Sequence, residues 1–170
     1  GAVAILRAAI DNYPHRGRTH IPAAHEGLIA GFSHEYVRYM QGGLYRGSFR
    51  PLNDAVAAGR IRGLAGVVGC NNARVPQDAP TTQIIAELIR NDVLVVVTGC
   101  AATGAAKYGY LRPEFMEQAG AGLREVCEAI GIPPVLHVGS CVDNSRILTI
   151  LTQCATEGGL GEDIADLPAV

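Results

Sequence analysis

The sequence has no tryptophan, a single lysine and no apolar run long enough to cross a membrane. A membrane-spanning helix needs about 20 consecutive apolar residues, and charged or polar residues interrupt every stretch of that length here. Thirteen arginines join Lys107 against sixteen acidic residues, which leaves a formal charge of -2 and no basic cluster for nucleic acid. We therefore expect neither a membrane span nor a nucleic-acid partner.

Targeting and disulfide signals are also missing. The start "GAVAILRAAI" has no initiator Met and no charged leader followed by a cleavage site. The five cysteines form no CxxC pair and are odd in number, which argues against a secreted disulfide framework. We expect a cytoplasmic protein. Because the chain starts inside a predicted helix over 3–10, we also expect it to be a piece of a longer chain.

The length and composition fit one α/β domain spanning residues 1–170. Apolar residues make up 48% of the 170 residues, and a domain of that size buries roughly 70% of the surface of its unfolded chain. Residues 1–60 predict mainly helix and loop that lead into a sheet. Within them we expect a helix over 26–40 that Gly42 and Gly43 end, and a helix over 48–60 capped by Asn53 or Asp54.

Strands and helices alternate through the rest of the chain. Apolar runs predict strands over 61–69, 92–99 and 132–140, and amphipathic patterns predict helices over 81–91, 114–131 and 143–155. The first helix should have a threonine cap, the second should end at Gly131, and the third should be capped by Asp143 or Asn144. This order predicts a doubly wound, mostly parallel, Rossmann-like sheet.

Three cysteines follow these strands, each after a small residue: Cys70, Cys100 and Cys141. Parallel strands bring their carboxyl ends to one edge, where open α/β sheets bind ligands, so we expect the thiols to converge. The helix after each thiol should lower its pKa and favour the thiolate. Thiolates suit zinc, copper(I) or an iron–sulfur cluster, and a structural zinc would usually show paired ligands at short spacing.

The helical cysteines and the small-residue turns have other interpretations. Cys127 and Cys154 lie in amphipathic helices and are predicted to be packing residues. The turns "TGCAATG" and "VGSCVDN" could cradle a phosphate, but neither has the spacing of a nucleotide-binding loop.

The five histidines lack the HExxH spacing of a zinc enzyme. His15, His20, His25 and His34 are predicted to be surface or structural residues. His137 shares a strand face with Cys141 and is expected to be a core residue, with proton transfer beside the site as the alternative.

The segments "AGVVGCNNARVPQD", "NDVLVVVTGCAATGAAKYGYL" and "IPPVLHVGSCVDNSR", together with "IAGFSHE" and "GGLYRGSFRPLNDAVAAGRIRG", closely resemble the catalytic subunit of the anaerobic nickel–iron carbon monoxide dehydrogenases. The resemblance covers nearly the whole chain. It implies a Rossmann-like domain that helps to hold the nickel–iron–sulfur C-cluster, with Cys70 and Cys100 as iron ligands and Cys141 as the catalytic nickel ligand. The implied reaction oxidises CO with water to CO2, two protons and two electrons.

The resemblance also implies partners and further cofactors. A homodimer, an electron-transfer protein such as ferredoxin and additional iron–sulfur clusters are expected, and whether an acetyl-CoA synthase joins them stays open. The family's remaining cluster ligands and an active-site lysine have no counterpart in these 170 residues, so the chain alone should be inactive. The alternatives are a hybrid-cluster protein of the hydroxylamine reductase type and a non-catalytic α/β binding domain with structural cysteines.

Overall fold

Three parallel strands form the centre of the computed structural model, which describes residues 1–25 and 27–168. The strands are β1 (Gly63–Val67), β2 (Val93–Thr98) and β3 (Val135–Gly139), in the order β1-β2-β3. Leu64 pairs with Leu94, and Val95 pairs with Val135, so all three strands run in the same direction. Both neighbour pairs are therefore joined by crossovers, which brings their carboxyl ends to one edge.

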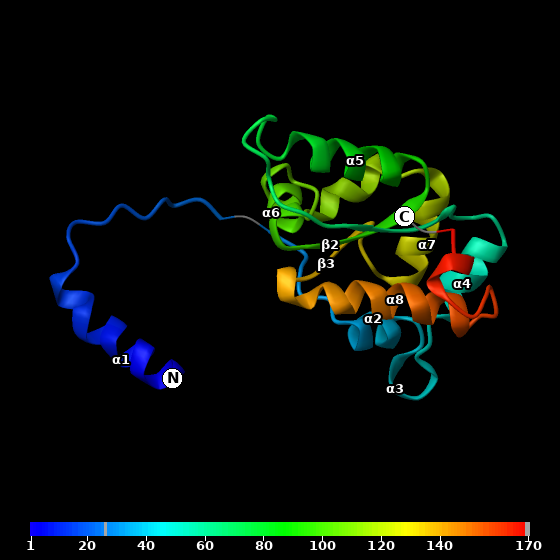
Figure 1. Cartoon of the computed structure of the whole chain (residues 1–170), viewed down its shortest axis with the longest axis horizontal. Coiled ribbons are helices and arrows are strands. Elements are labelled where there is room, and N and C mark those ends of the chain that lie inside the picture. The colour runs from blue at the N-terminus through cyan, green and yellow to red at the C-terminus, as the bar shows by residue number, and fades with distance from the viewer. Residues whose placement is uncertain (26, 169–170) are drawn as a thin grey trace.

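Helices cover both faces of this sheet. α5 (Ala79–Arg90) and α6 (Gly99–Lys107) lie on one side, and α8 (Asn144–Thr156) and α2 (His34–Met40) lie on the other (Figure 1). α7 (Ala121–Ile130) belongs to the second crossover, and η4 (Ile164–Asp166) follows α8. The prediction of an α/β fold around a parallel sheet is confirmed.

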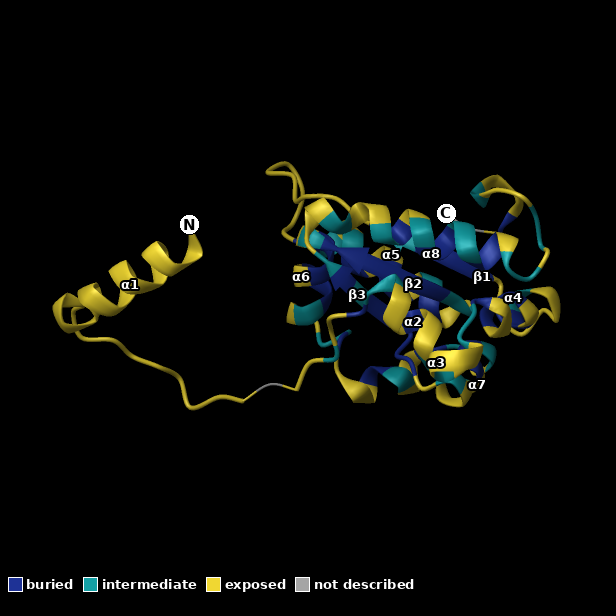
Figure 2. Ribbon diagram, turned by 90° about the horizontal axis from the view of Figure 1, so that it is seen from below, coloured by how far each residue is buried: buried dark blue, intermediate teal, exposed yellow. Residues whose placement is uncertain are grey.

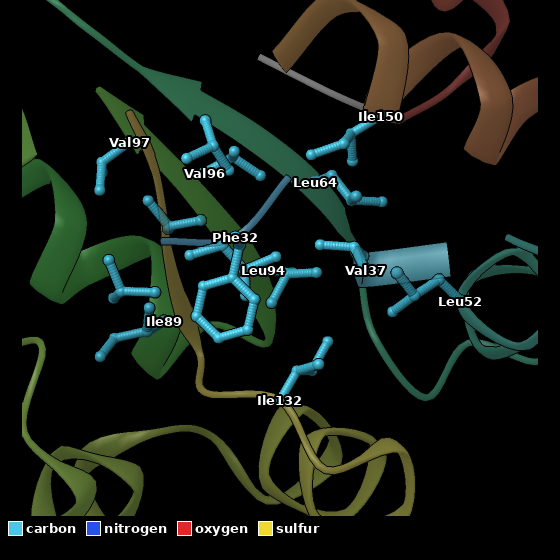
Figure 3. Close-up of a cluster of buried hydrophobic side chains, with 14 of the residues drawn as sticks. Phe32, Val37, Leu52, Leu64, Ile89, Leu94, Val96, Val97, Ile132 and Ile150 are labelled. Atoms are coloured by element: carbon cyan, nitrogen blue, oxygen red, sulfur yellow. The ribbon is translucent and has the colours of Figure 1, made fainter. Parts of the chain in front are cut away.

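The middle strand is buried on both of its faces. The side chains from Leu94 to Val97 are 0% exposed, which explains the uninterrupted apolar run of this segment. On the two faces they meet apolar residues of the covering helices and of the neighbouring strands, among them Ile89, Ile150 and Leu64 (Figure 3). The core thus fixes β2, and β2 leads directly into the segment that carries Cys100.

Residues 1–60 consist of helices and irregular segments, as predicted. They contain α1 (Ala2–Asn12), η1 (Tyr13–His15), α2, α3 (Gly43–Arg46) and α4 (Arg50–Ala57). Every residue from 1 to 25 is exposed, and α1 stands away from the sheet at the end of an extended segment (Figure 2). Among the described residues, no helix is both long and apolar enough to span a bilayer.

The helix predicted over 26–40 is wrong in its first half. α2 begins only at His34, because Ser33 caps it by accepting a hydrogen bond from the Tyr36 N–H at 3.1 Å. The preceding residues run alongside β3 instead, and the N–H groups of Gly31 and Phe32 both donate to the His137 carbonyl. Residue 26 lies outside the described residues. The helix ends at Met40, just before the predicted glycines.

The cap predicted at Asn53 or Asp54 is also wrong. α4 begins at Arg50, with Pro51 in its first turn, and Asn53 lies inside the helix. The Asn53 side chain is 1% exposed, and its amide donates to the Cys154 carbonyl at 2.6 Å. A polar residue that would cap a helix on the surface here connects two helices in the core.

Two further helix starts differ from the predictions. α5 begins at Ala79, before both threonines, and the Thr82 hydroxyl donates to the Asp78 carbonyl at 2.9 Å instead of capping. The helix predicted over 114–131 is divided into η2 (Pro113–Gln118) and α7. The division falls where a carboxylate oxygen of Asp92 accepts from the Leu123 N–H at 2.8 Å and so caps α7. Gly131 ends α7 with a φ of 83°, as predicted.

Candidate metal centre

The three cysteines that follow the strands all lie at the carboxyl edge of the sheet. Cys70 lies in the loop after β1, Cys100 is the second residue of α6, and Cys141 opens η3 (Cys141–Asp143) directly after β3. All three are free and exposed. The convergence expected from the sequence is therefore confirmed for the position of the residues. Their role as ligands is a separate question.

The pKa of Cys100 is affected by the thiols of Cys70 and Cys141, which lie close to it. The pKa of Cys100 is raised above 9.0, first by a hydrogen bond with the Cys70 thiol and then by the charge of that thiol, with burial and Cys141 adding to it. The expectation that a helix start would lower this pKa is wrong, because the crowding of ionisable sulfurs outweighs the helix terminus. Such crowding is relieved when a metal displaces the thiol protons and binds the thiolates.

The Cys141 sulfur packs against Gly99, the residue before Cys100. The Sγ atom of Cys141 occupies the space that a Cβ atom on residue 99 would need, and the Gly99 φ is +55°. Gly99 therefore meets both a steric and a backbone requirement that other residues would not. Because Gly99 precedes Cys100 in the chain, this contact sets Cys141 beside the Cys70–Cys100 pair.

Hydrogen bonds fix the loop around Cys141. A carboxylate oxygen of Asp143 accepts from the Ser140 N–H at 2.9 Å, while Arg146 lies 3.3 Å from the same carboxylate and donates to the Val138 carbonyl at 3.0 Å. Asp143 or Asn144 was expected to cap α8; Asp143 occupies the cap position, but its side chain makes no capping bond to that helix. The pKa of Asp143 is lowered, chiefly by the Ser140 N–H.

A second bond ties this loop to the middle strand. Thr98 is 2% exposed. Its hydroxyl lies 2.5 Å from the side-chain oxygen of Asn144, at the start of α8. The end of β2 and the start of α8 are thus joined beside Cys100 and Cys141. This arrangement holds thiols from separate elements in a fixed relation.

The donor set fits a cluster better than a single ion. In residues 1–25 and 27–168, no three His, Cys, Asp or Glu side chains converge closely enough to hold one metal ion. In an iron–sulfur cluster each thiolate binds a different metal atom, so the ligands are spread around the group. Three exposed sulfurs at one sheet edge suit that arrangement, and soft thiolates suit iron and nickel in a sulfide environment.

The two remaining cysteines lie in the core, as predicted for packing residues. Cys127 in α7 and Cys154 in α8 are both 0% exposed. Burial raises the pKa of each thiol to about 12. A thiol with so high a pKa is a poor metal ligand at neutral pH.

The histidines divide into exposed and half-buried ones. His15, His20 and His25 are exposed, which agrees with a surface role. His34 is half-buried, and its Nε2 atom lies 3.2 Å from Glu35. His137 was expected to be a core residue, but it is half-buried in β3, where its Nδ1 atom accepts from the Gly139 N–H at 3.2 Å.

Two residues of this region were not singled out from the sequence. Gly99 follows a strand like many glycines, and only the contact with Cys141 distinguishes it. Asp78 lies in a polar turn, yet the residue is 3% exposed and pairs with the only lysine of the chain. A lone lysine in an arginine-rich chain was the one sequence signal that could have drawn attention to this pair.

A parallel sheet with three free thiols at its carboxyl edge makes this chain an α/β protein with a candidate metal-cluster site. A sequence model described as the Prismane/CO dehydrogenase family matches residues 2–170. The chain belongs to that family.

Its relatives are consistent with this assignment. The chain is 48% identical to carbon monoxide dehydrogenase 1 of Methanosarcina mazei over 97% of its length, and 40% identical to carbon monoxide dehydrogenase 2 of Carboxydothermus hydrogenoformans over 98%. A nickel-free crystal structure of carbon monoxide dehydrogenase from Thermococcus sp. AM4 superposes with a TM-score of 0.82 at 47% identity and covers 98% of this chain and 26% of that one. The chain spans 26% to 28% of the two curated relatives.

Proposed function

We propose that these residues form part of a carbon monoxide dehydrogenase that oxidises CO with water to CO2, two protons and two electrons. The observation that carries the proposal is the meeting of three free thiols at one sheet edge, in a chain of the Prismane/CO dehydrogenase family. The named relatives support the same reaction. Bound at this edge, a nickel–iron–sulfur cluster supplies the metal coordination and the redox chemistry that CO oxidation needs.

The three thiols take different roles in this proposal. Cys70 and Cys100 hold iron, and Cys141 holds nickel, as the resemblance of their sequence motifs implies. The raised pKa of Cys100 means that this thiol releases a proton on binding metal, so cluster assembly should be favoured by higher pH. Gly99 leaves room for the Cys141 sulfur, and the bonds from Ser140 and Arg146 to Asp143 keep its loop in place.

The partners of the reaction are also proposals. CO and water are the substrates, and a ferredoxin-type protein takes up the electrons in the cytoplasm. A homodimer with further iron–sulfur clusters is the expected assembly. One relative, 35% identical, is named carbon monoxide dehydrogenase/acetyl-CoA synthase subunit beta and comes from Moorella thermoacetica. An acetyl-CoA synthase is therefore a partner to test.

Metal analysis of the anaerobically purified full-length gene product tests the proposal. We expect nickel, iron and sulfide together, and CO-dependent reduction of a viologen dye. Iron and sulfide without nickel in a fully matured protein would favour the hybrid-cluster alternative. A folded protein without iron, sulfide or nickel would favour a binding domain with structural cysteines.

A further inference from the structure

We propose that Asp78 is a positioning residue that sets the separation of the Cys70 and Cys100 sulfurs. The proposal rests on the function proposed above. Asp78 lies between the loop that carries Cys70 and the helix that carries Cys100, and its carboxylate bonds to both. The chemical basis is a buried link between two ligand-bearing segments that lie beyond the end of the β1–β2 pairing at Val67 and Val97.

On the loop side, the link is made through Asn71, the residue directly after Cys70. The Asn71 amide donates to Oδ1 of Asp78 at 2.8 Å, and the Asp78 N–H donates to the Asn71 side-chain oxygen at 2.6 Å. This reciprocal pair leaves Asn71 little freedom. Since Asn71 and Cys70 are neighbours in the chain, the position of the Cys70 backbone depends on Asp78.

On the helix side, the link is made through Lys107 at the end of α6. The Lys107 ammonium pairs with Oδ2 of Asp78, so the two carboxylate oxygens face different segments. Gly104 lies on the same helix, and a Cβ there would be 3.3 Å from the Asp78 Cβ. The part of α6 that follows Cys100 therefore packs tightly against Asp78.

A contribution to stability alone does not explain the burial and the backbone conformation of Asp78. Its side chain is 4% exposed, and its φ of 62° lies in the left-handed region that costs a non-glycine residue energy. The ion pair joins a buried carboxylate to a half-exposed ammonium and is a weak source of net stability, because the carboxylate's loss of hydration opposes the attraction. Asp78 also makes no side-chain cap for α5, although it occupies the cap position. Its carboxylate bonds to the two cysteine segments, with Gln77 as a further donor at 3.4 Å.

Lys107 has a second effect, on charge. With the lysine in place, the pair is neutral, and the thiolates of the site do not face an additional uncompensated negative charge. The Asp78 carboxylate bonds to the residue after Cys70 and lies against the helix that carries Cys100, so its charge is placed beside the site. Without the lysine, a cluster at this edge should be harder to reduce, because an added electron would meet the Asp78 charge.

The test uses the full-length gene product with Asp78→Asn, Lys107→Met and Lys107→Arg. Asp78→Asn keeps an oxygen for Asn71 but places an amide opposite the lysine, so it loosens the helix side alone. Changes to residues that orient metal ligands cost about 10- to 100-fold in metal affinity or activity, and we expect a loss of CO oxidation in that range. Asn53→Ala is the control, since it removes a buried link between α4 and α8 that touches neither cysteine segment.

The reduction potential of the cluster separates positioning from general stability. Lys107 is 52% exposed, so Lys107→Met should fold, and we expect it to lower the potential and alter the electron paramagnetic resonance signature. Lys107→Arg should restore both. Unchanged spectra, potential and activity in Asp78→Asn and Lys107→Met would overturn the proposal, as would equal losses in Asn53→Ala. A wild-type protein without iron and nickel would overturn the proposed function as well.

Discussion

The Sγ atom of Cys141 lies in the space that the Cβ atom of any side chain at position 99 would fill. Gly99 itself begins α6 and precedes Cys100. A residue without ligand atoms thus controls how close two proposed ligands come to each other. The contact explains why glycine stands between the end of β2 and Cys100.

Gly99→Ala should therefore displace Cys141. We expect the full-length variant to lose most of its nickel while much of its iron remains, because the added methyl group meets the sulfur proposed to bind nickel. Gly109→Ala is a matched control: its φ of +79° imposes a similar backbone strain, of about 1–2 kcal/mol, but the nearest atom to its Cβ would be 3.6 Å away. Metal analysis should find full nickel in Gly109→Ala. Equal nickel in both variants would show that the contact is unimportant.

Cys141→Ser exchanges a soft donor for a hard one. We expect the full-length variant to keep much of its iron, lose most of its nickel and lose CO oxidation by more than the roughly 100-fold that changes around a ligand produce. Cys70→Ser and Cys100→Ser should lower the iron content as well. Nickel and iron analysis beside an activity assay distinguishes these outcomes. Full nickel occupancy and activity in Cys141→Ser would show that Cys141 is a structural residue after a strand and not a nickel ligand.

The replacement of Cys127 or Cys154 by alanine should affect stability alone. Each thiol is fully buried, and the truncation should lower the free energy of unfolding by about 1 kcal/mol. Nickel and iron should stay at wild-type levels, since neither residue lies at the sheet edge. Loss of nickel from either folded variant would contradict the assignment of these cysteines to the core.

The sheet and the convergence of the thiols could be predicted because each rests on a local pattern. The apolar run before Cys100 reads as a strand buried on both faces, and parallel strands place their ends together whatever the loops do. The end of α7 was equally local, because Gly131 has the left-handed backbone that favours glycine. These features depend on a few neighbouring residues.

The features that were missed depend on distant partners. Asn53 looks like a cap until the Cys154 carbonyl is found beside it, and Asp92 caps α7 from 31 residues away. The pKa of Cys100 rises because of Cys70, which no consideration of its own helix could show. Asp78 likewise gains its importance from Lys107, at the end of α6. In each case the deciding contact joins two residues that are far apart in the sequence.

The buried thiols predict a specific sensitivity to alkaline pH. In the folded chain the pKa of Cys127 and of Cys154 is about 12, against 9.0 for an ordinary thiol. A group with a raised pKa contributes stability that is fully present below the unfolded value and is lost as the pH rises through the folded one. The free energy of unfolding should therefore fall between pH 9 and 12, by at most about 1.4 kcal/mol per pH unit for each thiol.

Urea unfolding at a series of pH values checks this, with Cys127→Ala as the comparison. Other groups also titrate in this range, so the difference in slope between wild type and variant is the informative quantity. We expect the variant to start less stable at pH 8 and to lose stability more slowly above pH 9, because one fewer buried thiol has to remain protonated. Parallel slopes would mean that Cys127 ionises as readily in the folded chain as in the unfolded one.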